Sequence, residues 1–116
     1  MKYIKYFESN HIKTIEAEVI KRIDDLLKEY EKYVGKYVII EYKSKNTIFL
    51  GKFKAFVLNG YFVGFEFYDW DDFYNGYQTS NETLHLTDFS VLEASDSFPE
   101  IKKDYEMFMN ANKYNL

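Results

Sequence analysis

Three aspartates stand close together in the segment DWDDFYNGY, residues 69–77. Carboxylate oxygens at short spacing can bind a hard cation such as calcium, and two carboxyl groups in a pocket can work as general acid and base. Asp69, Asp71 and Asp72 do not follow the spacing of a calcium-binding loop, and no glutamate stands at its twelfth position. No neighbouring residues predict an enclosing pocket either. We therefore predict no metal site and no acid–base pair in this segment.

The remaining nucleophiles and bases do not form a catalytic pattern. The chain has no cysteine, its two histidines are His11 and His85, and they lie far apart in the sequence. Serine and threonine occur without a nucleophile elbow or a phosphate-binding loop. His85 stands between Leu84 and Leu86, as a residue of a half-buried strand would. The sequence thus predicts no catalytic residue, no cofactor and no enzymatic activity.

Lysines are concentrated in the first predicted hairpin, beside the aromatic residues Tyr42 and Phe49. These lysines are Lys43, Lys45, Lys52 and Lys54. Lysine next to aromatic rings can bind nucleic acid through phosphate contacts and base stacking. The alternative is a solvated hairpin whose lysines prevent unwanted pairing of strand edges. We favour the solvated hairpin, because the chain has a net charge of −4 and a nucleic-acid-binding domain usually has a dominant basic face.

Aromatic and acidic residues alternate in FEFYDWDDFYNGY, residues 65–77. Phe65 and Phe67 are spaced like the buried face of a strand, but beyond Tyr68 the alternation of apolar and polar residues fails. Unpaired carboxylates are costly to bury, so this end must reach water. We predict a polar loop over residues 69–81.

Two interpretations of this acidic-aromatic loop stay open, and they are compatible. Aromatic residues beside acids are typical of a protein-binding hot spot. The predicted contact residues are Asp69, Trp70, Asp71, Asp72, Tyr74 and Tyr77. Alternatively, the loop folds over the open end of a barrel, with its rings inside and its acids outside.

Length and composition are those of one domain covering residues 1–116, with 47% hydrophobic and 21% aromatic residues. The N-terminus lacks the apolar run of a secretory signal, and no segment has the ~20 apolar residues of a membrane span. We expect a cytoplasmic protein. Charge is uneven: between residues 55 and 101 there is no lysine or arginine, against nine carboxylates.

Hydrophobic periodicity predicts a helix, five strands and a second helix. A helix over about residues 11–34 has an apolar stripe at steps of three and four: Ile12, Ile15, Val19, Ile23, Leu26, Leu27, Tyr30, Tyr33 and Val34. Period-two segments predict strands over 36–42, 47–57, 61–68, 82–86 and 89–94. Gly51 predicts a bend or bulge, and Asn59-Gly60 a tight hairpin turn.

The C-terminal helix is expected over about 98–112, with Phe98, Ile101, Tyr105 and Phe108 buried. The predicted fold is α+β: a small, strongly bent five-stranded antiparallel β-barrel over about 36–94, with a helix at each end packed on it. Its predicted core is Val38, Ile40, Phe49, Phe53, Val63, Phe65 and Leu86.

The order of a helix, GKYVIIEYK, FLGKF with a glycine inside the strand, a hairpin and two short strands resembles the Sm-like family of small β-barrels, which are close in shape to SH3-like barrels. The resemblance covers about residues 12–94 and implies the bent barrel. Sm-like proteins bind uridine-rich RNA through an Asp and an Asn near the second hairpin and an Arg-Gly pair before the last strand. This chain has Asn59 but no Asp there, and Thr87-Asp88 replaces Arg-Gly. No RNA-binding residue therefore carries over.

The sequence favours a small non-catalytic binding or regulatory protein that docks a basic surface of a partner protein, as a monomer or a homodimer. In a sharper version the protein is a phage or mobile-element inhibitor of the anti-restriction or anti-CRISPR type, whose carboxylates take the place of nucleic-acid phosphates on a nucleic-acid-handling protein. The competing interpretation is an RNA-binding Sm-like module that uses the lysine-rich hairpin. We expect no membrane partner.

Overall fold

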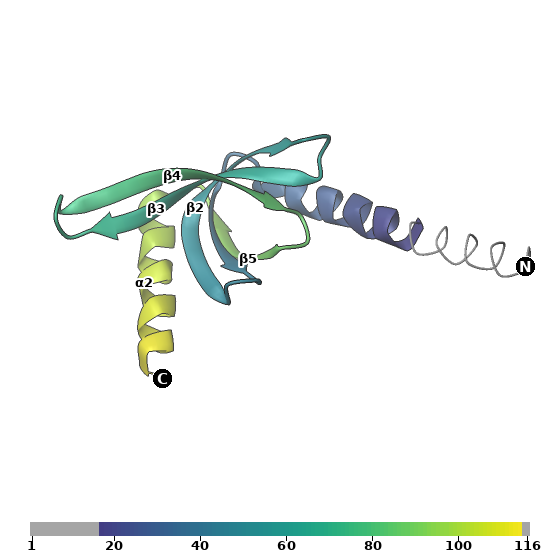
Figure 1. The fold of residues 1–116 in the computed structure, drawn as a ribbon. Helices are drawn as coiled ribbons and strands as arrows, with labels where there is room; N and C mark the ends of the chain where they lie inside the picture. The colour runs from purple at the N-terminus through teal and green to yellow at the C-terminus, as the bar shows by residue number, and fades with distance from the viewer. Residues whose placement is uncertain (1–16, 115–116) are drawn as a thin grey trace, which may run out of the picture.

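The computed structural model describes residues 17–114 of the chain, and the side chains of residues 17–111. Within that range the protein is α+β, with two helices and one five-stranded antiparallel sheet (Figure 1). The N-terminal helix, described over 17–30, leads into a 3-10 turn, η1, and α2 ends the described chain. The elements are η1 (Glu31–Tyr33), β1 (Tyr37–Tyr42), β2 (Thr47–Val57), β3 (Phe62–Asp71), β4 (Gly76–His85), β5 (Phe89–Ser95) and α2 (Phe98–Tyr114). The expected helix start, with His11, Ile12 and Ile15, lies outside the described residues.

The strands lie in the order β4-β3-β2-β1-β5, and all neighbouring pairs are antiparallel. The prediction of two helices around a five-stranded antiparallel sheet is confirmed. Closure into a barrel is not confirmed, because β4 and β5 form the two edges of the sheet and do not pair with each other. β4 instead follows β3 outward along a long hairpin, so its backbone is paired on one side only.

Gly51 lies where β2 packs closely against β3. A Cβ atom at this position would lie 2.6 Å from the carbonyl oxygen of Glu66 and 2.6 Å from the ring of Phe67, so no larger residue fits without a shift of the backbone. The predicted bulge is not at this glycine. The register between β2 and β3 shifts three residues later, between Phe53 and Ala55. Gly51 therefore permits close strand packing.

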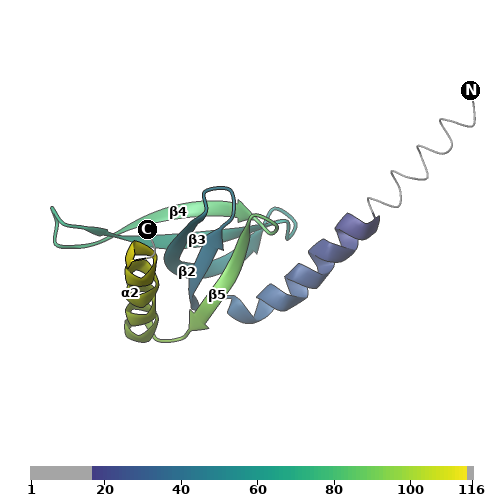
Figure 2. The same ribbon diagram turned by 90° about the horizontal axis from the view of Figure 1, so that it is seen from below.

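The sheet has a hydrophobic core on each face, and each core is completed by one helix. Side chains alternate along β1, so Val38 and Ile40 lie in the core with the N-terminal helix, whereas Ile39 packs toward α2. The predicted core residues are buried except Phe49, which is partly buried and packs against the same core. Figure 2 shows the two helices on different sides of the sheet. Both terminal helices therefore pack on the sheet, as expected.

The outer turns of both helices are more exposed than the sequence predicts. In the N-terminal helix, Ile23 and Tyr30 are buried, and the Tyr30 hydroxyl donates a hydrogen bond to the carbonyl oxygen of Phe89 at 3.2 Å. Val19, expected in the buried stripe, is about half exposed because this part of the helix extends away from the sheet (Figure 2). In α2, Ile101 is fully buried, but Phe108 is 38% exposed because the helix also continues past the sheet.

The expected polar loop over residues 69–81 is wrong. β3 continues to Asp71 and β4 begins at Gly76, so these residues form a hairpin that is closed by a four-residue turn over 72–75. The outer part of this hairpin, residues 68–79, is called the β3–β4 arm below. It extends beyond α2, away from the rest of the sheet (Figure 1). Cross-strand pairing maintains the strands there, although the apolar positions move to the opposite face of β3 after Phe67.

Candidate functional site

The turn of the β3–β4 arm is organised by Asp71. Its Oδ1 atom accepts hydrogen bonds from the backbone N–H groups of Phe73, at 2.9 Å, and Tyr74, at 3.4 Å. Asn75 completes the turn with a φ of 51°, a conformation that asparagine adopts more readily than most residues. This side-chain-to-backbone bonding is a common way for Asp to stabilise a turn. Asp71 therefore has a structural role, although the sequence predicts it as a partner contact.

Trp70 is held by two neighbours on the same arm. Its indole N–H donates a hydrogen bond to Oδ1 of Asp72 at 2.6 Å. Its ring meets that of Tyr77, its partner across the two strands, edge to face with 5.3 Å between the ring centres. The Trp70 side chain nevertheless remains 51% exposed. The structure thus brings Trp70, Asp72 and Tyr77 together, and it presents an oriented indole to solvent.

Two aromatic rings project from the tip of the arm. Phe73 is 87% exposed and Tyr74 is 67% exposed, and their rings contact each other edge to face with 5.0 Å between centres. Tyr74 is a predicted contact residue, but Phe73 is absent from that prediction. The signal for Phe73 is its place between Asp71 and Asn75, two residues that commonly build turns, since a side chain in a four-residue hairpin turn points to solvent.

A cleft of about 580 Å³ separates the underside of the arm from α2. Residues from the arm (Tyr68, Asp69, Trp70 and Tyr77) and from α2 (Lys102, Tyr105 and Glu106) line it. Burial, and then the nearby charge of Glu106, raise the pKa of Tyr77, while burial and then Asp69 raise that of Tyr105. Rings from two elements and two carboxylates thus share one open space.

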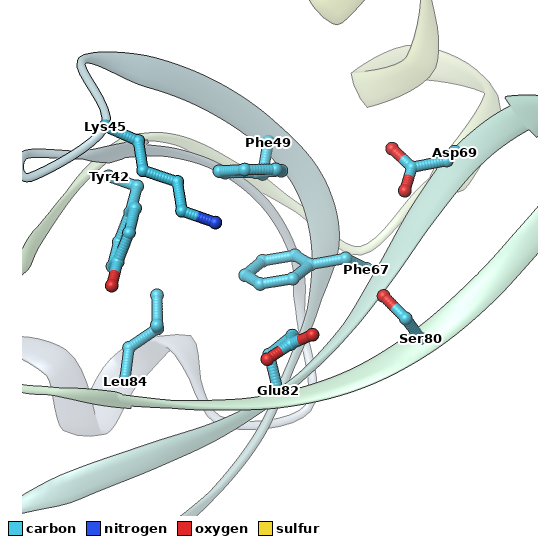
Figure 3. Close-up of a pocket in the computed structure, with 8 residues that line it drawn as sticks. All are labelled: Tyr42, Lys45, Phe49, Phe67, Asp69, Ser80, Glu82 and Leu84. Atoms are coloured by element: carbon cyan, nitrogen blue, oxygen red, sulfur yellow. The ribbon is translucent and has the colours of Figure 1, made fainter.

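A smaller pocket of about 180 Å³ opens on the other face of the sheet (Figure 3). The rings of Phe49 and Phe67 stack at its centre with 5.0 Å between ring centres, and Glu82 borders it from β4. Lys45 lies above the ring of Tyr42, its amino group 5.7 Å from the ring centre, and points into the pocket. This pocket combines the Lys45 amino group with the rings of Tyr42, Phe49 and Phe67.

The four predicted lysines lie in two different elements. Lys43 and Lys45 lie in the turn between β1 and β2, whereas the other two belong to the middle of β2. There the Lys52 amino group lies 5.7 Å from the ring centre of Tyr37, and Lys54 forms an ion pair with Glu66 at 3.9 Å. Lys45, Lys52 and Lys54 therefore have different neighbours.

His85 interacts with Thr87 in the turn that follows its strand and with Phe62 on the neighbouring strand. His85 lies 2.8 Å from the Thr87 hydroxyl through Nδ1, which also accepts a hydrogen bond from the Thr87 backbone N–H at 3.2 Å. The His85 ring meets Phe62 edge to face. Among the described residues, no group of three or more His, Asp or Glu side chains is arranged to hold a metal ion.

Comparison of the chain with protein-family models, with curated protein sequences and with solved structures finds no significant match. In the part of the chain that the structure describes, no helix combines the length and the apolar character needed to cross a membrane.

Proposed function

We propose that this chain is a non-catalytic binding protein that docks a basic surface of a partner protein with its β3–β4 arm. The exposed rings of Phe73 and Tyr74, on a turn fixed by Asp71, are the observation that carries this proposal. Burying an exposed aromatic side chain is worth about 1.5–3 kcal/mol, and aromatic residues dominate binding hot spots. A partner whose surface has a recess that receives Phe73 and Tyr74 would bury these rings and gain this free energy, and the arm would not have to reorganise.

Charge supports a basic partner. The segment from residue 55 to 101 contains nine carboxylates and no lysine or arginine. Within the described residues its one ion pair with a lysine is that of Glu66 with Lys54. Much of the negative field therefore extends into solvent, where it accelerates association with a positively charged surface.

A sharper form of the proposal is mimicry of nucleic acid. Carboxylates along a projecting hairpin, such as Asp69 and Glu82, would occupy the phosphate sites of a nucleic-acid-handling protein, while the tip rings provide an anchor. This would make the chain a cytoplasmic inhibitor encoded by a phage or mobile element, of the anti-restriction or anti-CRISPR type. The partner would then lose its nucleic acid when it binds this chain.

The second candidate, an RNA-binding module that resembles Sm-like barrels, is supported by the smaller pocket. Lys45 beside Tyr42 and the stacked rings of Phe49 and Phe67 could hold a nucleobase next to a phosphate. Two observations make it the weaker candidate. Lys43, Lys52 and Lys54 do not line the pocket, and Glu82 and Asp69 border it.

The decisive experiment compares the variant Phe73→Ala/Tyr74→Ala with a matched control, Tyr61→Ala, which removes an exposed aromatic ring from the turn between β2 and β3. The wild type and both variants are used to capture proteins from a lysate of cells that express the chain. The recovered partner is then purified, and its binding to each of the three proteins is measured by titration. We expect binding by the wild type and Tyr61→Ala, a loss of about tenfold or more in the tip variant, and competition by nucleic acid. Equal binding by all three proteins would contradict the proposal.

The same proteins are titrated with a labelled oligouridylate to test the second candidate. We expect no saturable binding. Binding that weakens in Lys45→Ala and falls steeply with added salt would instead support the RNA-binding module.

A further inference from the structure

The cleft between the β3–β4 arm and α2 combines aromatic rings with negative charge. Trp70 and Tyr77 line it from the arm and Tyr105 from α2, so rings enter from two elements. Asp69 and Glu106 lie at its borders, and neither has an ion-pair partner within residues 17–111. Its volume, about 580 Å³, is in the range of pockets that bind ligands.

A cation already occupies part of this cleft. The Lys102 amino group lies 5.3 Å from the centre of the Tyr77 ring, within the distance at which a cation is attracted to an aromatic face. Lys102 is a residue of α2, so this contact joins the helix to the arm. The cleft therefore accommodates a positive charge against its rings, and one lysine leaves the charge of Asp69 and Glu106 only partly balanced.

We propose that this cleft binds the guanidinium group of an arginine side chain that a protein partner presents. The inference rests on the proposed function, since it supplies the point at which a basic partner surface would be held. A guanidinium group is planar, stacks on aromatic faces and donates hydrogen bonds to carboxylates. The half-exposed Trp70 ring and the Glu106 carboxylate both line the cleft and provide the two kinds of contact. Asp69 points its carboxylate toward the pocket on the other face of the sheet (Figure 3), so it contributes negative charge near the cleft.

Lys102 provides a sharp test because it competes with the incoming cation. Replacing it with methionine keeps an apolar stem of similar length, removes the repulsion and frees the face of Tyr77. The variant Lys102→Met should therefore bind a cationic ligand more tightly than the wild type. Lys103 is the matched control, because it is the exposed neighbour on α2 and does not line the cleft.

The assay uses the single tryptophan of the chain, Trp70, as a fluorescent probe. The full chain is titrated with N-acetyl-argininamide and, separately, with N-acetyl-citrullinamide, which has nearly the same shape but no charge. We expect saturable binding of the arginine compound with a Kd of about 1 mM, as suits a ligand of this size. The citrulline compound should bind about tenfold more weakly or not at all.

The variants extend the assay. Glu106→Gln and Asp69→Asn should each weaken binding about threefold, Lys102→Met should strengthen it about threefold, and Lys103→Met should leave it unchanged. Thermal unfolding of each variant checks that the fold is retained. Equal binding of the arginine and citrulline compounds, or no effect of Lys102→Met, would overturn the inference.

Absence of arginine binding in the cleft can be distinguished from absence of partner binding by the arm. The tip variant Phe73→Ala/Tyr74→Ala does not alter the lining of the cleft. If the protein partner depends on the tip but the arginine compound does not bind, the proposed function stands and the inference about the cleft is wrong.

Discussion

The inner and outer halves of the β3–β4 hairpin belong to the same two strands but have opposite surroundings. In the inner half, Val63, Phe65 and Phe67 are buried in the core that the N-terminal helix completes. In the outer half, Asp69 and Asp71 replace phenylalanine at the corresponding alternate positions, and the tip rings are exposed. The same two strands are thus buried at one end and exposed at the other, depending on what packs against them, and we propose that the exposed end serves recognition.

The largest expected effect lies in the inner half. Phe65 is fully buried and contacts Phe53, Phe67 and Phe89 with ring centres 5.0–5.3 Å apart. Phe65→Ala should lower the free energy of unfolding by about 3–5 kcal/mol. Phe73→Ala, in the outer half, should change it by less than about 0.5 kcal/mol. Urea denaturation measures both, and similar losses in the two variants would contradict the division of the hairpin into these halves.

A second prediction concerns the strand that supports the hairpin. Gly51→Ala places a methyl group 2.6 Å from the carbonyl oxygen of Glu66 and should destabilise the fold by about 1–3 kcal/mol. Gly64→Ala is the control, because the nearest atom to its new Cβ lies at 3.8 Å. Denaturation midpoints should fall for Gly51→Ala and remain nearly constant for Gly64→Ala. A harmless Gly51→Ala would show that β2 and β3 are not packed this closely.

The outer half should depend on its turn. Asp71→Ala removes the acceptor of two backbone hydrogen bonds and should destabilise the arm locally by about 1 kcal/mol. Hydrogen exchange should accelerate at residues 70–77 and stay unchanged in β1. Asp69→Ala is the control, since its side chain does not bond the turn. Faster exchange throughout the sheet in Asp71→Ala would mean that the arm and the body unfold together.

The smallest effect concerns how α2, which supports the arm from below, responds to pH. Hydrogen bonding to Asp104, with burial, raises the pKa of Glu93 to about 7. A carboxyl group whose pKa is higher in the folded chain stabilises the fold while it is protonated, so this contribution is lost as pH rises from about 4.5 to 7. Thermal unfolding between these values should show the decline, and Glu93→Gln should reduce it. If stability instead rises with pH to the same extent in the wild type and in Glu93→Gln, the raised pKa of Glu93 is contradicted.

The sequence predicts most of the body and misses the arm, for a physical reason. β2 runs from Thr47 to Val57, the range that its period-two pattern predicts, and its alternate side chains reach different cores: Phe53 the core of the N-terminal helix and Leu50 that of α2. In the arm, aromatic and acidic residues still alternate from Tyr68 to Asp71, but after Phe67 the apolar positions move to the opposite face of β3, so the pattern looks interrupted. Trp70 and Tyr77 share one face because of cross-strand pairing, which a single strand does not reveal.

The candidate site was predictable in part. Trp70, Tyr74 and Tyr77 lie on the arm as aromatic residues that reach solvent or a cleft, whereas Asp71 and Asp72 bond the turn and the indole. The cleft itself depends on α2, since Tyr105 and Glu106 follow the arm by about thirty residues in the sequence. Its existence is a consequence of tertiary packing, and local patterns contain no signal for it.

Hydrogen exchange of the chain, alone and in complex with its captured protein partner, tests whether the β3–β4 arm is the contact surface. We predict slower exchange at residues 70–77 in the complex, and no change in the turn between β1 and β2 at residues 43–46. Protection of residues 43–46 with no change at residues 70–77 would show that the partner binds the lysine-rich hairpin and not the β3–β4 arm.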